Sequence, residues 1–147
     1  MNGSKTDSFL IRTFQFPNDY DKVLELWQAA GKGIHVGRSD EPGAIQKKLQ
    51  RDPDLFLLAE QDACLVGTVL GGFDGRRGIV YHLAVAANYR QQGIGEALME
   101  ELEKRLKQKG CIRSYLLVTH DNHGAVQFYE KLGWERMDLL AYGKDLD

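Results

Sequence analysis

The sequence predicts an α/β fold in which a mixed sheet carries helices on its faces, as a single domain over residues 1–147. Apolar strand-like runs and amphipathic helical stretches alternate along the chain in the order β-α-α-β-β-β-α-β-α-β. No repeat, linker or low-complexity segment interrupts this alternation, and 147 residues is about the length of one domain.

The expected strands follow from apolar runs bounded by turn residues. The run at 9–16 alternates loosely, and the runs at 55–59 and 64–70 are separated by three polar residues, which predicts a hairpin. The run at 79–85 is apolar on both faces except for Tyr81 and His82, which favours a central strand. Shorter runs at 115–118 and 134–142 predict the last two strands.

The expected helices follow from their boundary residues and their apolar faces. Proline and polar residues at 17–19 precede the first helix, and Pro42 opens a second, short one. The third helix begins at Ile94, is acidic early and basic late, and meets a glycine at 110, which suits the helix dipole. A fourth is expected over 122–132, ended by Gly133.

Charge and hydropathy exclude several classes of function. A net charge of −2 argues against a general affinity for nucleic acid or for an anionic membrane. No apolar run approaches the roughly 18 residues of a membrane span, and residues 1–8 lack the apolar centre of a secretory signal. We therefore expect a cytoplasmic protein whose anion-binding site, if it has one, is local.

Residues 90–95 are the candidate for such a local anion site. Arg90-Gln91-Gln92-Gly93-Ile94-Gly95 leads from the strand at 79–85 into a helix, whose first N–H groups have no partner inside the helix. Glycines at 93 and 95 let an anion approach the backbone, and Arg90 adds a guanidinium. The alternative is a tight strand-to-helix turn with no ligand. A dinucleotide site is disfavoured because Leu98 stands where the third glycine of that motif would be, and the Walker lysine motif is absent.

Together with its surroundings, this loop resembles the R/Q-x-x-G-x-G/A motif of the GNAT acetyltransferases. The strand Tyr81-His82-Leu83-Ala84-Val85 precedes it at the distance found in that family. Residues 122–134 are similar to the family's second motif, N-x-x-A-x-x-F/L-Y-x-x-x-G-F, with Trp134 in place of the usual phenylalanine. The resemblance covers nearly the whole chain and is strongest to small bacterial members of the YpeA type, with RimI-like enzymes more distant.

The resemblance implies acetyl-CoA as co-substrate and a mostly antiparallel sheet that splays between the strands at 79–85 and 115–118. The main chain of Leu83, Ala84 and Val85 would pair with the pantetheine arm, and the Val85 N–H could donate to the thioester oxyanion. Asn122 would bond the same arm, although a plain helix cap explains it equally well. The cofactor-binding residues implied in this way are Leu83, Ala84, Val85, Arg90, Gln91, Gln92, Gly93, Ile94, Gly95, Glu96, Asn122 and Phe128.

The catalytic residues implied by the resemblance are Tyr129 and Tyr81. The Tyr129 hydroxyl would be the general acid for the departing thiolate of coenzyme A. The general base is left open, because Leu117 occupies the position where RimI-like members carry a carboxylate. Tyr81, on the strand at 79–85, could hold a water or pass a proton in place of that carboxylate, with simple packing as the alternative. By strand alternation His82 is expected on the face opposite Tyr81, as a core histidine.

The implied reaction is acetyl transfer to a primary amine by direct attack in a ternary complex, with no metal. His120 and His123 are not expected to form a metal site, because no further ligands converge with them in the sequence. The acceptor wall is expected at the loop 33–41, and Arg76 and Arg77 could bind an acidic acceptor. A homodimer is compatible with the sequence. Two other readings stay open: a non-catalytic acyl-CoA sensor and a nucleotide-binding regulator.

Overall fold

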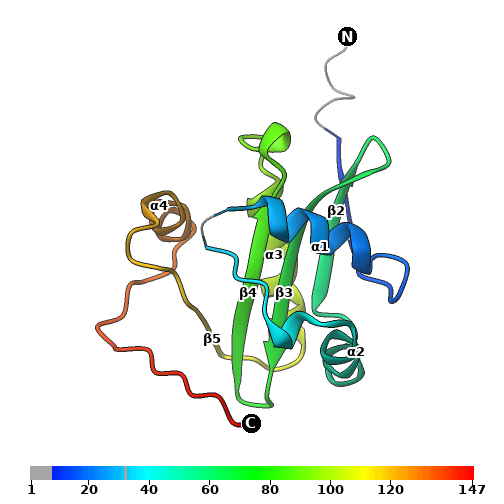
Figure 1. The fold of residues 1–147 in the computed structure, drawn as a ribbon. Helices are drawn as coiled ribbons and strands as arrows, with labels where there is room; N and C mark the ends of the chain where they lie inside the picture. The colour runs from blue at the N-terminus through cyan, green and yellow to red at the C-terminus, as the bar shows by residue number, and fades with distance from the viewer. Residues whose placement is uncertain (1–7, 32) are drawn as a thin grey trace. The chain divides into compact units, whose positions relative to one another are not determined.

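The computed structural model describes residues 8–31 and 33–147, which form two compact parts that divide after Leu117. The first part is built on a five-stranded sheet with the strands in sequence order (Figure 1). Its first four strands are antiparallel neighbours, and the fifth runs parallel to the fourth. The strands are β1 (Leu10–Thr13), β2 (Phe56–Gln61), β3 (Cys64–Phe73), β4 (Arg77–Val85) and β5 (Arg113–Leu116).

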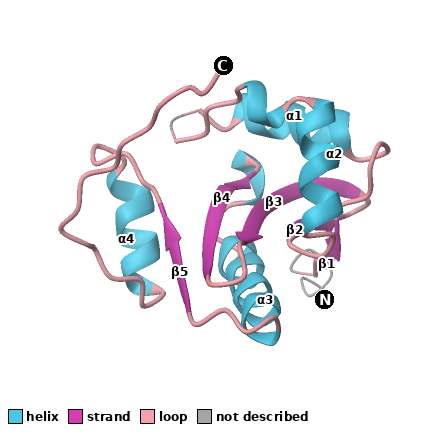
Figure 2. Ribbon diagram, turned by 90° about the horizontal axis from the view of Figure 1, so that it is seen from below, coloured by secondary structure: helices cyan, strands magenta, loops and turns pink. Residues whose placement is uncertain are grey.

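Three helices cover the two faces of this sheet, as the sequence predicts (Figure 2). Helices α1 (Tyr20–Ala29) and α2 (Pro42–Arg51) lie on one face, and α3 (Ile94–Gln108) lies on the other. A buried cluster joins the sheet to α1 and α2 and contains Phe14, Val23, Trp27, Ile45, Phe56, Leu58, Leu70 and Ala84.

Helix α3 approaches the sheet closely because β3 carries glycine where the two meet. A Cβ added to Gly71 would lie 2.5 Å from Cδ1 of Leu102, and one added to Gly67 would lie 3.0 Å from Cδ1 of Leu98. The distance at Gly71 is shorter than real carbon contacts and the one at Gly67 is tight, so a larger residue at either position would require the leucine side chains of α3 to move. This packing fixes the start of α3 beside the sheet.

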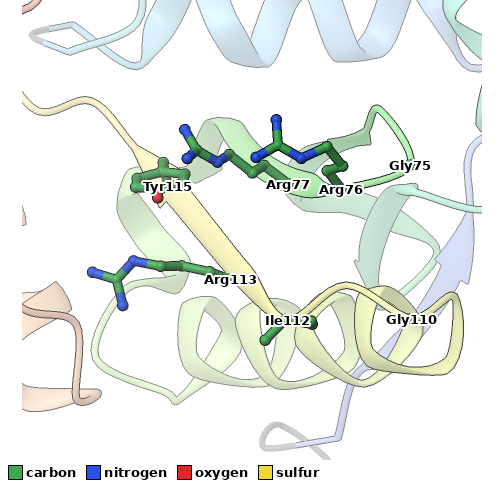
Figure 3. Close-up of a pocket in the computed structure, with 7 residues that line it drawn as sticks. All are labelled: Gly75, Arg76, Arg77, Gly110, Ile112, Arg113 and Tyr115. Atoms are coloured by element: carbon green, nitrogen blue, oxygen red, sulfur yellow. The ribbon is translucent and has the colours of Figure 1, made fainter.

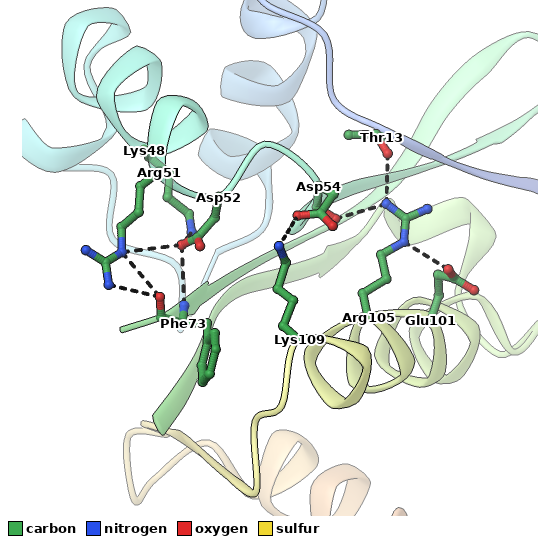
Figure 4. Close-up of polar contacts among 9 residues, drawn as sticks. All are labelled: Thr13, Lys48, Arg51, Asp52, Asp54, Phe73, Glu101, Arg105 and Lys109. Carbon is green, nitrogen blue, oxygen red and sulfur yellow. Dashed lines mark hydrogen bonds and ion pairs between the residues drawn. The ribbon is translucent and has the colours of Figure 1, made fainter. Parts of the chain in front are cut away.

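Arg105 of α3 links the helix to the first half of the chain (Figure 4). Its guanidinium donates to Oγ1 of Thr13 at 2.8 Å, to the carbonyl of Asp54 at 2.9 Å and to Glu101 at 2.9 Å. On the other face, the buried Asp52 accepts from Lys48 at 2.7 Å and from the N–H of Phe73 at 3.3 Å. Buried charges with several partners of this kind hold elements in a fixed register.

The second part of the chain contains α4 (His123–Lys131), close to the expected helix over 122–132. The expected strand at 134–142 is wrong, because the structure has neither helix nor strand from 134 onward. A strand needs a neighbour that pairs with its backbone groups, and apolar content alone does not supply one. The expected strand at 115–118 is shifted to Arg113–Leu116, where it pairs with β4.

Candidate active site

Strand β4 is paired on both sides over its first half only. On the side of β5 the pairing runs from Arg77↔Arg113 to Val80↔Leu116 and stops there, while β4 continues to Val85 beside β3. The predicted splay of these two strands is therefore confirmed. Along residues 81–85 one edge of β4 is left without a strand among the described residues, so its backbone can pair with an extended ligand.

A bulge lies in this open half of β4, at His82. Leu70 of β3 pairs with Tyr81, and Thr68 pairs with Ala84, so β4 has one residue more than β3 between the two pairs. His82 takes the left-handed conformation, with φ of +49°. For a residue other than glycine this conformation costs about 1–3 kcal/mol and persists only where its surroundings enforce it.

The bulge overturns the expectation that His82 faces away from Tyr81. Because of the extra residue, strict alternation fails, and the His82 ring lies against Trp27 of α1, with 4.6 Å between the ring centroids. Tyr81 is paired with Leu70, which belongs to the same buried cluster as Trp27. Directly opposed residues share a face, so Tyr81 and His82 lie on the same side of the sheet. His82 is thus directed to the α1 face of the sheet, with 16% of its side chain exposed.

Hydrogen bonds from three elements hold this bulge. The indole N–H of the buried Trp27 donates to Oγ1 of Thr68 at 3.0 Å, and the Thr68 hydroxyl donates to the carbonyl of His82 at 3.1 Å. The His82 side chain then meets Asp40, with Nε2 and Oδ1 3.0 Å apart.

Asp40 connects His82 to the loop expected to form the acceptor wall. Its carboxylate is buried, and Oδ2 accepts the N–H of Gly37 at 3.0 Å. The hydroxyl of Tyr20 donates to the Asp40 carbonyl at 2.7 Å, which ties the same turn to α1. The loop 33–41 is thus anchored on β4 through a side-chain pair.

The expected diphosphate loop has the backbone geometry of an anion site. Gln91 and Gly93 take φ of +67° and +82°, and Gly93 is the N-cap of α3, with no side chain capping the helix. The first N–H groups of α3 therefore stay available to a ligand. Arg90 turns back to the strand, since its Nε donates to the carbonyl of Val85 at 3.0 Å. This bond braces the loop on the last residue of β4.

Asn122 and Tyr129 lie at the two ends of α4. The side chain of Asn122 caps the helix by accepting the N–H of Ala125 at 3.2 Å, as its plain structural reading predicts. The Tyr129 ring lies edge-on to Phe128 at 5.2 Å and to Trp134 at 6.2 Å. Burial raises the pKa of Tyr129 to about 12, so its hydroxyl stays protonated at neutral pH.

Tyr81 differs from Tyr129 in its surroundings. Tyr81 is 44% exposed, and its partial burial raises the pKa of its hydroxyl. A phenol with a raised pKa donates hydrogen bonds at neutral pH but is a poor proton acceptor. Leu117 is also exposed, at 74%, and offers no polar group of its own.

Arg76 and Arg77 lie at the opposite end of β4 from the open half. They line a shallow hollow of about 400 Å³ together with Arg113 and Tyr115 (Figure 3). The guanidinium carbons of Arg77 and Arg113 each lie 5.5 Å from the centre of the Tyr115 ring. The arginines therefore border the paired ends of β4 and β5 and are not part of the bulge region. No group of three or more possible metal ligands occurs in the described ranges 8–31 and 33–147.

The open strand edge followed by an uncapped helix start is an arrangement suited to an extended, anionic ligand, and comparison with known proteins gives the family. Residues 20–134 match the model of the Acetyltransferase (GNAT) family, so the chain belongs to this family. An acetyltransferase of Pectobacterium atrosepticum is 40% identical over 136 residues, which cover 92% of this chain and 94% of the relative. An uncharacterized N-acetyltransferase of Yersinia pestis shows the same identity and coverage.

Solved structures share the fold. PaiA N-acetyltransferase from Thermoplasma acidophilum, solved in complex with coenzyme A, aligns with a TM-score of 0.77 at 23% identity. The alignment covers 90% of this chain and 92% of the other. None of the helices in the described part of the chain is long and apolar enough to cross a membrane. As a member of this family, the chain is an acetyltransferase.

Sequence reasoning missed Asp40, Thr68 and Trp27 as parts of the site. Asp40 lies 42 positions from His82, and no spacing rule connects them. The only available signal was the pair Tyr81-His82 in an otherwise apolar strand, which marks polar groups that must find partners.

Proposed function

We propose that this protein transfers the acetyl group of acetyl-CoA to a primary amine by direct attack in a ternary complex. The observation that carries the proposal is the open half of β4 leading directly into the uncapped start of α3. An extended amide chain ending in a diphosphate fits these two features in that order. The name of one relative, an N-acetyltransferase of Yersinia pestis, supports an amine as acceptor.

The donor would be held mainly by backbone groups. The main chain of 83–85 would pair with the pantetheine arm, and the N–H groups of 91–96 would bind the diphosphate. Asn122 and Phe128 would complete the site from α4. The dipole of α3 contributes only about 0.3–1 kcal/mol per exposed charge, so several N–H bonds must share the affinity.

In the reaction, the neutral amine attacks the thioester carbon, a C–N bond forms and the C–S bond breaks. The Tyr129 hydroxyl would interact with the leaving sulfur, either by transferring its proton or by donating a hydrogen bond. Full proton transfer from a phenol with a pKa of about 12 to an ordinary thiolate, pKa near 8.5, is uphill by about 5 kcal/mol. Tyr129 therefore acts best by donating a hydrogen bond as negative charge develops on sulfur. Tyr81 would hold a water near the acceptor.

Binding and turnover distinguish this proposal from its rivals. Thermal shifts with acetyl-CoA, NAD and ATP should show stabilisation by acetyl-CoA alone. Thiol release should then follow with at least one member of an amine panel: a lysine amide, a dipeptide with a free N-terminus, a linear polyamine and an amino sugar. Binding of acetyl-CoA with no turnover across the panel would favour a sensor, and preference for NAD or ATP would favour a nucleotide-binding regulator.

A further inference from the structure

We propose that His82, oriented by Asp40, is the base that takes the proton from the acceptor amine. The inference rests on the proposed function, which needs a neutral amine, whereas primary amines are mostly ammonium ions at neutral pH. The sequence leaves the general base unassigned, because Leu117 is apolar. The inference gives this role to a side chain that the bulge brings to the α1 face of the sheet.

The pairing with Asp40 fixes which ring nitrogen carries the proton. An ionised carboxylate only accepts hydrogen bonds, so Nε2 of His82 must donate to Oδ1 of Asp40 across their 3.0 Å contact. The second carboxylate oxygen accepts the N–H of Gly37 at 3.0 Å, which stabilises this orientation of the Asp40 side chain. A neutral His82 therefore carries its lone pair on Nδ1.

Nδ1 is placed to use that lone pair. No described residue forms a hydrogen bond with Nδ1, and the atom itself is not fully buried. The atom therefore reaches solvent, although most of the side chain is enclosed, with 16% exposed. An imidazole that served only to fill the core would have no reason to keep one nitrogen unbonded and open to water.

The backbone gives a second, independent indication. His82 is held in the left-handed conformation by the Thr68 hydroxyl on its carbonyl and by Trp27 against its ring. Strain maintained in this way by several elements is a property of functional positions. The strained residue lies within the half of β4 that has no partner on the side of β5, directly before Leu83, where the pantetheine arm would bind.

His82 would activate the acceptor by one proton transfer. The acceptor arrives as an ammonium ion, Nδ1 of His82 takes one of its protons, and the resulting imidazolium is stabilised by the Asp40 carboxylate. The free amine then attacks the thioester carbon and the C–S bond breaks. The proton that the nitrogen loses as the amide forms passes through water to the departing sulfur, which gives the thiol of coenzyme A, and His82 returns its own proton to solvent. Two further titratable groups near this ring are Tyr20, bonded to the carbonyl of Asp40, and Tyr81, its neighbour on β4.

Two substitutions test the pair. His82→Gln can still donate to Asp40 but cannot take up a proton. Asp40→Asn can keep the N–H of Gly37 on its oxygen while its amide donates to Nε2, which moves the ring proton to Nδ1 and removes the base. We expect each to lower kcat/KM for the best amine of the panel by about 10²–10⁴-fold at pH 7. The dissociation constant for acetyl-CoA should not change. His120→Gln, an exposed histidine, is the matched control and should behave as the wild type.

The pH profile separates a base from a structural residue. The deficit of His82→Gln should shrink as pH rises toward the pKa of the amine, since the free amine then needs no base. A deficit of equal size at every pH, or no deficit, would overturn the proposal. If His82→Gln fails to fold, His82→Asn replaces it, because asparagine tolerates the left-handed conformation.

A measurement on the protein without any acceptor gives an independent reading. Nitrogen-15 NMR of the His82 ring should show the neutral form protonated on Nε2 in the wild type and on Nδ1 in Asp40→Asn. Protonation on Nδ1 in the wild type contradicts the inference. A wild type that binds no acetyl-CoA or acetylates no amine contradicts the proposed function instead. An active wild type with an active His82→Gln contradicts the inference alone.

Discussion

The two halves of the proposed site use different chemical groups: backbone in one half and side chains in the other. The donor region, residues 83–85 with 91–96, is formed by backbone: an open strand edge, a left-handed glycine and the N–H groups at the start of α3. The groups that we propose to react are side chains: His82 with Asp40, and Tyr129.

This difference determines what each region tolerates. Backbone groups bind whatever the side chains are, provided that the φ angles are kept and no carboxylate enters the loop. A reacting side chain loses its role when a single atom is removed. The predictions that follow probe this contrast, in order of decreasing effect.

The largest effect is expected for Tyr129→Phe, which removes only the hydroxyl. We expect kcat to fall by about 10²–10⁴-fold with the affinity for acetyl-CoA unchanged, because the hydroxyl would act on the leaving sulfur only. Steady-state kinetics and calorimetric titration with acetyl-CoA measure the two quantities. Tyr142→Phe, at an exposed tyrosine, is the control. An unchanged kcat would remove Tyr129 from the reaction.

In the donor region, Gly93→Asp should weaken acetyl-CoA binding by about 10²–10³-fold, because it adds a negative charge beside the diphosphate, and its carboxylate can cap α3 and so compete for N–H groups whose bonds to a charged ligand are worth about 1.5–3 kcal/mol each. Gly110→Asp provides a control matched for backbone strain, since both glycines have positive φ, +82° and +94°, and open space around a Cβ. Calorimetric titration should find normal acetyl-CoA affinity in the control. Equal losses in both variants would mean that strain, and not charge, is responsible.

A smaller effect is expected at the support of the bulge. Thr68→Val keeps the volume but leaves the buried indole N–H of Trp27 without its acceptor. This should lower the free energy of unfolding by about 1–3 kcal/mol. Urea denaturation measures the loss, with Thr119→Val, an exposed threonine, as the control. A change of less than the experimental error would show that the bulge does not depend on this hydrogen bond.

The smallest effect concerns the ion pair between Arg12 of β1 and Asp19, the residue before α1. Hydrogen bonds from Arg12 hold the pKa of Asp19 below its ordinary value. A lowered pKa in the folded state contributes stability that is fully present above the unfolded pKa, near 3.9, and is lost as the pH falls through the folded one.

The loss between pH 5 and pH 2 should therefore be about 1 kcal/mol larger for the wild type than for Asp19→Asn, as urea denaturation across this range would show. At pH 7 the same substitution should leave kcat and acetyl-CoA affinity as they are. A large change in either would mean that the two regions share a support that the structure does not indicate.

The backbone part of the site was predictable because it depends on local sequence. Glycine at 93, the helix that follows and the apolar strand before it are neighbours in the chain, and each has a conformational preference of its own. The strand expected at 134–142 failed for the opposite reason. An apolar run needs a paired neighbour, and the sequence of the run does not say whether one is present.

The sequence by itself determined the order of the elements through residue 132, the loop at 90–95 and the family resemblance that the comparison confirms. Only the tertiary structure decided where His82 points, because one extra residue in β4 changes the face that a side chain occupies. It also brought Asp40 to that side chain across 42 positions of sequence, a contact created by folding the chain and encoded in no local pattern.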